Sequence, residues 1–287
     1  MGLSIRRHLN IMGLRTTKLI GMFWGESFPF YYISEYPRSG GNWLGGMVAD
    51  YLRLPFPSHS VFPYGCAAVL HNHWSYSRRL RRVYYIFRDG RDVCLSMYFF
   101  CLRGLVSESP GERRYYAKRL GNLQIDDITP ANCARNLPEF IRCWVRTPFG
   151  CKISWADHVK QWAFDRPNVI PISYEQLSED CEGALARILP VHTKEPVDRE
   201  RLRATIEKFS FQKISGRQQG KSDPFSFYRK GIVGDWRNHF TRTAGEVFHQ
   251  LCGQTLIDLG YEQDGSWLDE LSDVPASCPD EAETTLS

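Results

Sequence analysis

The chain has 287 residues, of which 43% are hydrophobic and 14% aromatic, a globular composition that suits one large α/β domain. All 36 lysines and arginines, but only 22 of the 32 acidic residues, lie at or before Arg242. This basic body indicates a polyanionic ligand, a nucleic acid or an anionic membrane surface, with a solvated basic face as the alternative. No apolar run approaches the roughly 18 residues of a membrane span. The nine cysteines form no C-x-x-C pairs, so we expect no zinc site, no compact disulfide framework and a reducing, cytoplasmic location.

The N-terminal segment, residues 1–25, is basic and amphipathic but is interrupted by glycines. A packed lead-in helix and a helix lying on a membrane surface both fit this pattern. We favour the packed helix, and peripheral membrane contact is the alternative.

The stretch from Phe28 to Leu44 predicts a buried strand, a tight loop and the first turn of a helix. Residues 30–33 form the strand, residues 37–41 supply the turn, and a helix over residues 42–53 follows. Such a loop points backbone N–H groups and a helix N-terminus at whatever lies above it, which predicts an anion site. An ordinary strand-to-helix turn is the alternative.

This loop differs from a Walker A loop, which ends in Gly-Lys-Ser/Thr because the lysine reaches the outer phosphates and the hydroxyl holds magnesium. Here the loop ends in Gly40-Gly41-Asn42-Trp43, and its one cation, Arg38, precedes the glycines. The sequence therefore disfavours a magnesium-dependent kinase or ATPase.

Two further apolar runs, residues 66–70 and 83–87, read as strands, and the second leads into a helix from Asp92 to about Arg103. Strands that alternate with helices predict a central parallel β-sheet flanked by helices, with functional groups at the C-terminal ends of the strands. Candidate site residues follow three strands in succession: Arg38 and Ser39, His71 and His73, and then Arg88 and Ser96.

Three segments match a known family. Y-P-R-S-G-G-N-W-L, residues 36–44, resembles the 5′-phosphosulfate loop of sulfotransferases, which use 3′-phosphoadenosine 5′-phosphosulfate (PAPS) as sulfuryl donor. Residues 83–100 resemble that family's 3′-phosphate strand, turn and helix, and R-K-G-I-V-G-D-W-R, residues 229–237, resembles its R-K-G-x-x-G-D-W-K segment. The three occur in family order over about 210 residues, so the resemblance is specific.

The resemblance implies a single domain over residues 26–263 with a P-loop nucleotide-binding-like sulfotransferase fold, PAPS as cofactor, the bisphosphate PAP as product, and no metal. It also implies two sets of phosphate ligands. The 5′-phosphate set comprises Arg38, Ser39, Gly40, Gly41, Asn42 and Trp43. The 3′-phosphate set comprises Arg88, Ser96, Arg229, Lys230 and Gly231.

Two more segments resemble the family: residues 154–161, a W-x-x-H-V helix, and residues 169–175, a strand that ends in Tyr-Glu. By this resemblance Tyr174 reaches the adenine, Trp43 stacks on it and Phe211 covers the other face. Aromatic faces suit a flat base. An ordinary core aromatic is the alternative for each of the three.

Sulfuryl transfer moves a charged group in line from a phosphate oxygen to an acceptor hydroxyl or amine, so positioning and charge stabilisation dominate. His73 falls where the family places the general base, and Arg38 would neutralise the bridging oxygen. His71 stands where the family often has a lysine. Either His71 takes a weaker version of that role or Arg38 carries it alone.

Acceptor contacts in this family come from variable loops, and these are rich in aromatic residues here. The loops lie around residues 23–28, 58–64, 99–112 and 137–151. Phe99, Phe100 and Phe149 are expected near the mouth, which favours a small apolar or phenolic acceptor. We expect no nucleic-acid partner, because no recognisable motif supports one. The acidic tail, residues 264–287, is expected to be at least partly disordered.

Two other classes of function remain open. A kinase-like P-loop nucleotide enzyme would need the metal-binding hydroxyl and the Gly-Lys pair that the loop lacks. A non-catalytic nucleotide-binding module would keep the fold without turnover, and His71 in place of lysine is the feature that favours it.

Overall fold

The computed structural model describes residues 2–28, 30–57, 67–121, 123–124, 127–164 and 166–274. Internal contacts divide the chain into two compact units. The first comprises Met1–Phe87 and Lys160–Ile214, and the second comprises Arg88–Val159 and Ser215–Ser287. The domain limits at residues 26 and 264 stay predictions.

The first unit is built on a four-stranded sheet in the order β2-β1-β3-β4, with all neighbouring strands parallel. The strands are β1 (Phe30–Glu35), β2 (Ala68–Asn72), β3 (Val83–Phe87) and β4 (Val169–Ser173). Ile33 and Tyr84 are buried on one face of this sheet, and Tyr32 and Tyr85 are buried on the other. Because both faces are covered, these strands read as near-continuous apolar runs. The predicted central parallel sheet is confirmed.

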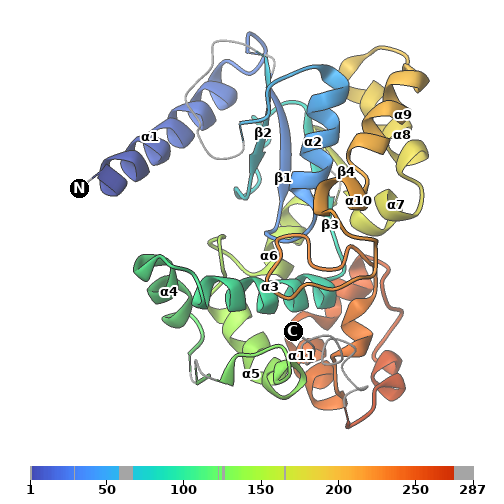
Figure 1. Ribbon diagram of the computed structural model, residues 1–287. Helices are drawn as coiled ribbons and strands as arrows, with labels where there is room; N and C mark the ends of the chain where they lie inside the picture. The colour runs from blue at the N-terminus through green and yellow to red at the C-terminus, as the bar shows by residue number, and fades with distance from the viewer. Residues whose placement is uncertain are drawn as a thin grey trace. The chain divides into compact units, whose positions relative to one another are not determined.

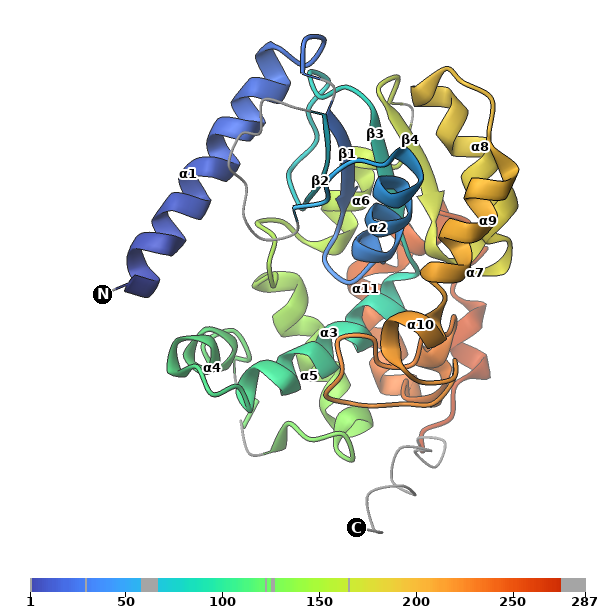
Figure 2. The ribbon, with the colours of Figure 1, turned by 45° about the horizontal axis from the view of Figure 1, so that its top comes forward.

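Helices cover the sheet of this unit. They are α1 (Gly2–Phe23), α2 (Gly41–Leu52), α7 (Tyr174–Glu179), α8 (Cys181–Thr193) and α9 (Arg199–Lys208). Figures 1 and 2 both show α2, α8 and α9 on one side of the sheet, where Leu44, Leu185 and Leu202 join one apolar cluster with Ile33 and Tyr84.

The predicted N-terminal helix forms as α1, and its C-terminal end is packed. A Cβ atom on Gly21 would overlap the Tyr32 hydroxyl of β1, so only glycine allows this close approach. Membrane contact by this segment stays a prediction. Among the described residues, no helix is both long enough and apolar enough to cross a bilayer.

Two strand ends differ from their predictions. β2 extends to Asn72, so His71 lies within the strand and not after it, because parallel pairing with β1 continues to the Ser34–Asn72 pair. The predicted start of this strand, Cys66, lies outside the described residues. β4 stops at Ser173, since a capping box there begins α7 and turns Tyr174 into its first residue.

The second unit is mainly helical. It contains α3 (Gly90–Leu105), α4 (Pro110–Ala117), α5 (Cys133–Arg146), α11 (Arg242–Asp258) and the short 3₁₀ helices η2 (Asp235–Asn238) and η3 (Ser266–Glu270). α3, α5 and α11 pack together (Figure 1), with Trp144, Trp155 and Phe248 stacked at their centre. α6 (Trp155–Trp162) and α10 (Phe211–Ser215) contain residues of both units.

A buried arginine anchors the core of the second unit. Arg91 is 1% exposed, and its guanidinium lies 3.8 Å and 4.7 Å from the ring centres of Trp236 and Trp267. Asp89 and Glu262 balance its charge, the Asp89 carboxylate at 2.7 Å. The hydrogen bonds and the contacts with aromatic rings thus compensate for the lost hydration of this buried charge.

Candidate active site

The loop between β1 and α2 is held in an unusual backbone conformation. Arg38 has φ 79° and Gly40 has φ 106°, both in the left-handed region. A Cβ at Gly40 would lie 2.7 Å from the Tyr174 ring, so glycine is needed there both for conformation and for space. A non-glycine residue such as Arg38 in this region carries strain of the kind that clusters at functional sites.

Ser39, which lies two residues before the first residue of α2, has a buried hydroxyl. Its side chain is 0% exposed, and its Oγ has no hydrogen-bond partner among the described residues. A buried hydroxyl is normally hydrogen-bonded, so we expect a bound ligand to supply the partner of this atom. At a helix N-terminus that partner is most readily an anion.

Two amides expected to face the 5′-phosphate already have partners in the protein. The Gly41 N–H donates to Glu35 Oε2 at 2.6 Å, and the Trp43 N–H donates to the Gly40 carbonyl at 3.0 Å. Protein acceptors therefore use part of the helix N-terminus.

Glu35 is a site residue that the sequence reasoning missed. It ends β1 at 3% exposure, and its Oε1 lies 2.8 Å from His71 Nε2. Burial alone would raise the pKa of Glu35, but the hydrogen bond and charge of His71, the charge of His73 and the Gly41 amide outweigh it and lower the pKa. The carboxylate is therefore ionised at neutral pH.

His71 and His73 lie side by side on and just after β2. Their ring centres are 4.8 Å apart at 83°, and His73 Nδ1 lies 3.1 Å from the Glu35 carbonyl oxygen. Burial, reinforced by the nearby His71 charge, lowers the pKa of His73 despite the opposing charge of Glu35. A neutral imidazole at pH 7 suits a general base.

These three residues also offer one potential metal-ligand atom each, all within 4.8 Å of one another. Two of the side chains already form the Glu35–His71 hydrogen bond. That hydrogen bond accounts for the closeness of Glu35 and His71 without a metal ion.

The first unit also brings together two of the expected adenine contacts. The Trp43 and Tyr174 rings lie 5.6 Å apart at 58°, both half-buried, and Trp43 Nε1 donates to the Phe209 carbonyl at 2.9 Å. Phe211 is half-buried at the start of α10.

In the second unit, Arg88 is held by an aspartate that the sequence reasoning missed. Arg88 Nη2 donates to Asp92 Oδ2 at 3.0 Å and to the Ile232 carbonyl at 2.9 Å. Asp92 also accepts the Gly234 and Trp236 amides at 2.8 Å and 3.0 Å. Asp92 thus ties the start of α3 to the loop that precedes η2. Ser96 is half-buried one turn further along α3.

A second aspartate, Asp235, gathers the cations of the R-K-G segment. Arg229 and Lys230 both donate to its carboxylate, Lys230 at 2.9 Å. Burial alone would raise the pKa of Asp235, but the His239 hydrogen bond and the two cations hold it far below its usual range. Gly231, the next residue, has φ 69°, where glycine is favoured.

The aromatic residues expected near the acceptor differ in exposure. Phe99 is 2% exposed, with its ring centre 4.4 Å from the Arg229 guanidinium and 5.7 Å from the His239 ring. Phe149 is also buried, whereas Phe100 is half-buried and contacts Tyr116. The predicted acceptor loop at residues 58–64 lies outside the described residues.

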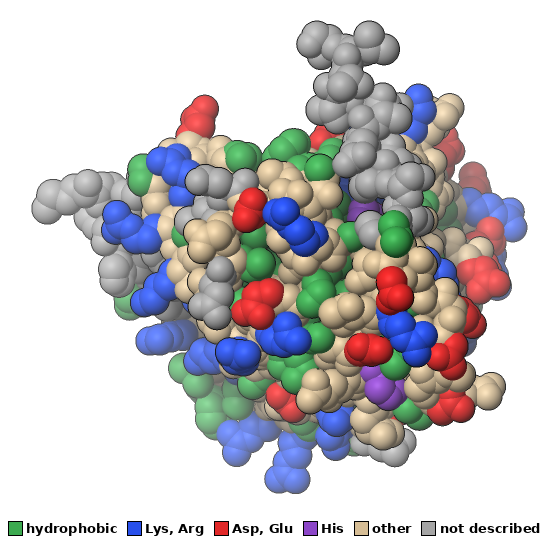
Figure 3. All heavy atoms as spheres, turned by 90° about the horizontal axis from the view of Figure 1, so that it is seen from below, with side chains coloured by type: hydrophobic (Ala, Val, Ile, Leu, Met, Phe, Trp, Pro, Cys, Tyr) green, Lys and Arg blue, Asp and Glu red, His purple; other side chains and the backbone are tan. Residues whose placement is uncertain are grey.

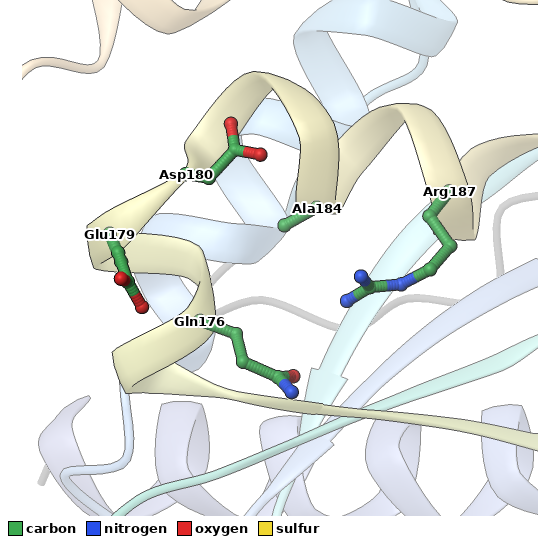
Figure 4. Close-up of a pocket in the computed structure, with 5 residues that line it drawn as sticks. All are labelled: Gln176, Glu179, Asp180, Ala184 and Arg187. Carbon is green, nitrogen blue, oxygen red and sulfur yellow. The ribbon is translucent and has the colours of Figure 1, made fainter.

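Two surface features lie apart from these residues. A hollow of about 180 Å³ between α7 and α8 is lined by Gln176, Glu179, Asp180, Ala184 and Arg187 (Figure 4), and none of these is a predicted site residue. Figure 3 shows one face on which Lys and Arg side chains gather toward the lower left and Asp and Glu toward the right. Neither feature adds a candidate ligand to the site.

Comparison with known proteins identifies a family. The family model described as "Sulfotransferase domain" matches residues 69–260, more than half of the 287 residues. Mouse Sulfotransferase 2B1 is 27% identical over 256 residues, which cover 76% of this chain and 68% of that protein. Human Sulfotransferase 2B1 is 29% identical over 179 residues, 58% of this chain and 42% of that protein. The chain thus spans less than half the length of its human relative.

Solved structures show the same fold. A mouse sulfotransferase, SULT7A1, complexed with PAP matches 89% of this chain and 94% of its own, with a TM-score of 0.57 and 18% identity. A retinol dehydratase in complex with androsterone and PAP matches 80% of this chain and 81% of its own, with a TM-score of 0.57 and 16% identity.

Proposed function

Because this chain belongs to the sulfotransferase domain family, we propose that it transfers a sulfuryl group from PAPS to a hydroxyl or amine of a small apolar or phenolic acceptor. The observation that carries the proposal is the buried Ser39 hydroxyl, which has no hydrogen-bond partner among the described residues and sits at the N-terminus of α2 beside the strained Arg38. An orphaned hydroxyl at such a position suits a phosphate or phosphosulfate group. Solved structures of the same fold in complex with PAP support the cofactor.

In the first unit, we assign the 5′-phosphosulfate to the loop and the adenine to the aromatic residues. Arg38 supplies charge, Ser39 a hydroxyl, and the Gly40–Trp43 turn the helix N-terminus. The rings of Trp43 and Tyr174, already 5.6 Å apart, offer a stacking surface to which Phe211 adds a further face.

In the second unit, we assign the 3′-phosphate to Arg88, Ser96, Arg229, Lys230 and Gly231. Asp92 and Asp235 hold three of these cations in fixed positions in the described structure. Cations preorganised in this way lose little side-chain entropy when an anion binds.

When bound, PAPS would supply the sulfuryl group, which the acceptor oxygen or nitrogen would receive while the 5′-phosphate oxygen would leave as an anion. His73 takes the acceptor's proton, a role that its lowered pKa favours. Arg38 stabilises the charge that develops on the leaving phosphate, and His71 assists beside it.

Calorimetric titration with PAP tests the proposal. We expect binding that is unchanged by magnesium and weakens about 10- to 100-fold in Arg38→Ala and in Arg88→Ala, since a hydrogen bond to a charged group contributes about 1.5–3 kcal/mol. Arg203→Ala and Arg135→Ala are charge-matched controls, because both arginines are exposed and, among the described residues, pair with surface acids.

Binding of magnesium-ATP in place of PAP would instead support a kinase-like enzyme. Binding of PAP without turnover of any phenol, apolar alcohol or amine in an acceptor panel would support a non-catalytic module.

A further inference from the structure

A glutamate at the end of β1 is energetically unfavourable unless a cation balances its charge. A buried carboxylate loses its hydration, and next to an anion-binding loop it repels the ligand. Glu35 is nonetheless buried and adjoins the N-terminus of α2 through the Gly41 amide. Within the described part of the chain, its carboxylate pairs with His71, whose Nε2 lies 2.8 Å from Oε1. His73, which follows β2, also faces this carboxylate.

The main chain of Glu35 fixes the tautomer of His73. A carbonyl oxygen can only accept a hydrogen bond, so the 3.1 Å contact requires a proton on His73 Nδ1. When the ring is neutral, its lone pair is then on Nε2. That is the atom able to take a proton from an acceptor hydroxyl.

The side chain of Glu35 fixes the role of His71. An ionised carboxylate is also an acceptor only, so the 2.8 Å contact requires a proton on His71 Nε2. Nε2 of His71 is thereby a hydrogen-bond donor and has no lone pair with which to act as a base.

Gly41 makes room for this pair. A Cβ there would lie 2.6 Å from Glu35 Cδ and 2.7 Å from His71 Nε2. Contacts this short would push both side chains out of their hydrogen bond. Glu35, Gly41 and His71 therefore form one interdependent set.

We infer that Glu35 is a positioning residue that gives the two histidines different proton roles: its carbonyl leaves His73 a base at Nε2, and its carboxylate holds His71 with a proton on Nε2, as a hydrogen-bond donor. This rests on the proposed sulfuryl transfer.

Nitrogen NMR of protein labelled with ¹⁵N-histidine tests the inference without any acceptor. In full-length protein with EDTA at pH 7.5, we expect a proton on Nε2 of His71 and on Nδ1 alone of His73. Assignments come from His71→Gln and His73→Gln. His192 is an internal reference of the opposite tautomer, because its Nε2 lies 3.1 Å from the Val83 carbonyl.

Glu35→Gln removes the charge while keeping the shape and the main-chain carbonyl. We expect the preference of His71 for a proton on Nε2 to weaken while His73 keeps its tautomer. We expect kcat to fall about 10²-fold, the cost of removing one preorganised charge-stabilising group, with the Kd for PAP changed less than about threefold. Glu35→Asp, which keeps the charge, should recover part of the rate.

Glu26→Gln is the matched control, because Glu26 is exposed and pairs with Arg81 on the same unit. A His71 without a proton on Nε2, or a proton on Nε2 of neutral His73, in the wild-type spectrum would overturn the inference. So would a Glu35→Gln variant whose rate and stability fall together with an unchanged histidine spectrum, since this indicates a purely structural role. Failure of PAP to bind would instead count against the proposed function alone.

Discussion

Each compact unit contains a buried pair of an acidic and a basic side chain. The two pairs have similar geometry but differ in whether the basic group can titrate. Arg91 in the second unit lies between two tryptophan rings and bonds to Asp89, and its guanidinium keeps its charge at every physiological pH. His71 in the first unit bonds to Glu35 at a similar distance, but an imidazole can gain or lose its proton near neutrality. A permanent charge is suited to holding helices together, whereas a titratable one is suited to proton chemistry.

The surroundings of the two pairs agree with this difference. Glu262, which completes the Arg91 pair, comes from a segment 171 residues away and so ties distant parts of the second unit together. Glu35, His71 and His73 all come from two adjacent strand ends next to the anion loop. Changes in the first set should therefore affect folding, and changes in the second set should affect catalysis.

The largest effect is expected on catalysis, from a change in the first unit. His73→Ala should lower kcat by about 10²- to 10⁴-fold, the usual contribution of a general base, with the Kd for PAP nearly unchanged. The measurement is steady-state kinetics with the best acceptor of the panel, together with calorimetry. A variant that keeps its rate would remove His73 from the mechanism.

A change in the buried Arg91 pair of the second unit is expected to cause a large loss of stability. Arg91→Met should lower the free energy of unfolding by about 3–5 kcal/mol, because it leaves Asp89 and Glu262 buried without their cation. Urea denaturation measures this. Arg135→Met, which removes the exposed pair with Asp127, should cost at most about 1 kcal/mol. Equal effects of the two changes would contradict the comparison.

Acid should weaken the first unit in particular. Burial lowers the folded-state pKa of both His73 and His192 from 6.5, so below that pH the unfolded chain takes up their protons first and stability falls. Between pH 7.5 and 5.5 we expect a loss of about 1–2 kcal/mol in urea denaturation. Glu35, whose pKa is also lowered, keeps its contribution across this window and loses it only at lower pH.

His192→Gln checks that prediction. Glutamine can still donate to the Val83 carbonyl but does not titrate, so about half of the acid loss should vanish. A pH profile as steep as that of the wild type would show that other groups are responsible.

The smallest effect on stability is expected at the orphaned hydroxyl. Ser39→Ala removes no hydrogen bond seen in the described structure, so the free energy of unfolding should change by less than about 1 kcal/mol while PAP binds about tenfold more weakly. Ser34→Ala is the matched control: this buried hydroxyl donates to Asn72 at 3.1 Å, so its loss should cost about 1 kcal/mol without weakening PAP. The reverse pattern would take Ser39 out of the anion site.

The parts of the fold that depend on local patterns could be predicted from the sequence. The apolar strands, the loop before α2 and the helix that carries Ser96 follow from runs of residue types and from the motifs, and the parallel sheet follows from their alternation. The strand ends could not be placed, because the pairing register of β1 with β2 and the cap at Ser173 decide them.

The acidic partners in the site were out of reach for a different reason. Asp92 and Asp235 lie within the motifs, four to six residues from the cations they hold, but the sequence does not show that Asp92 also binds the Gly234 amide, 142 residues away. Glu35 did give a signal, a carboxylate at the end of a largely apolar strand, which predicts a buried partner. Only the pairing of β1 with β2 shows that His71 is that partner.

The absence of a side chain at position 41 has a consequence for how this protein can change over evolutionary time. Any residue larger than glycine there would displace Glu35 and His71 together. Positions 35, 41 and 71 should therefore covary among close homologues: sequences with glutamate and histidine at the first and last should retain glycine, and sequences with a bulkier residue at 41 should have lost the glutamate.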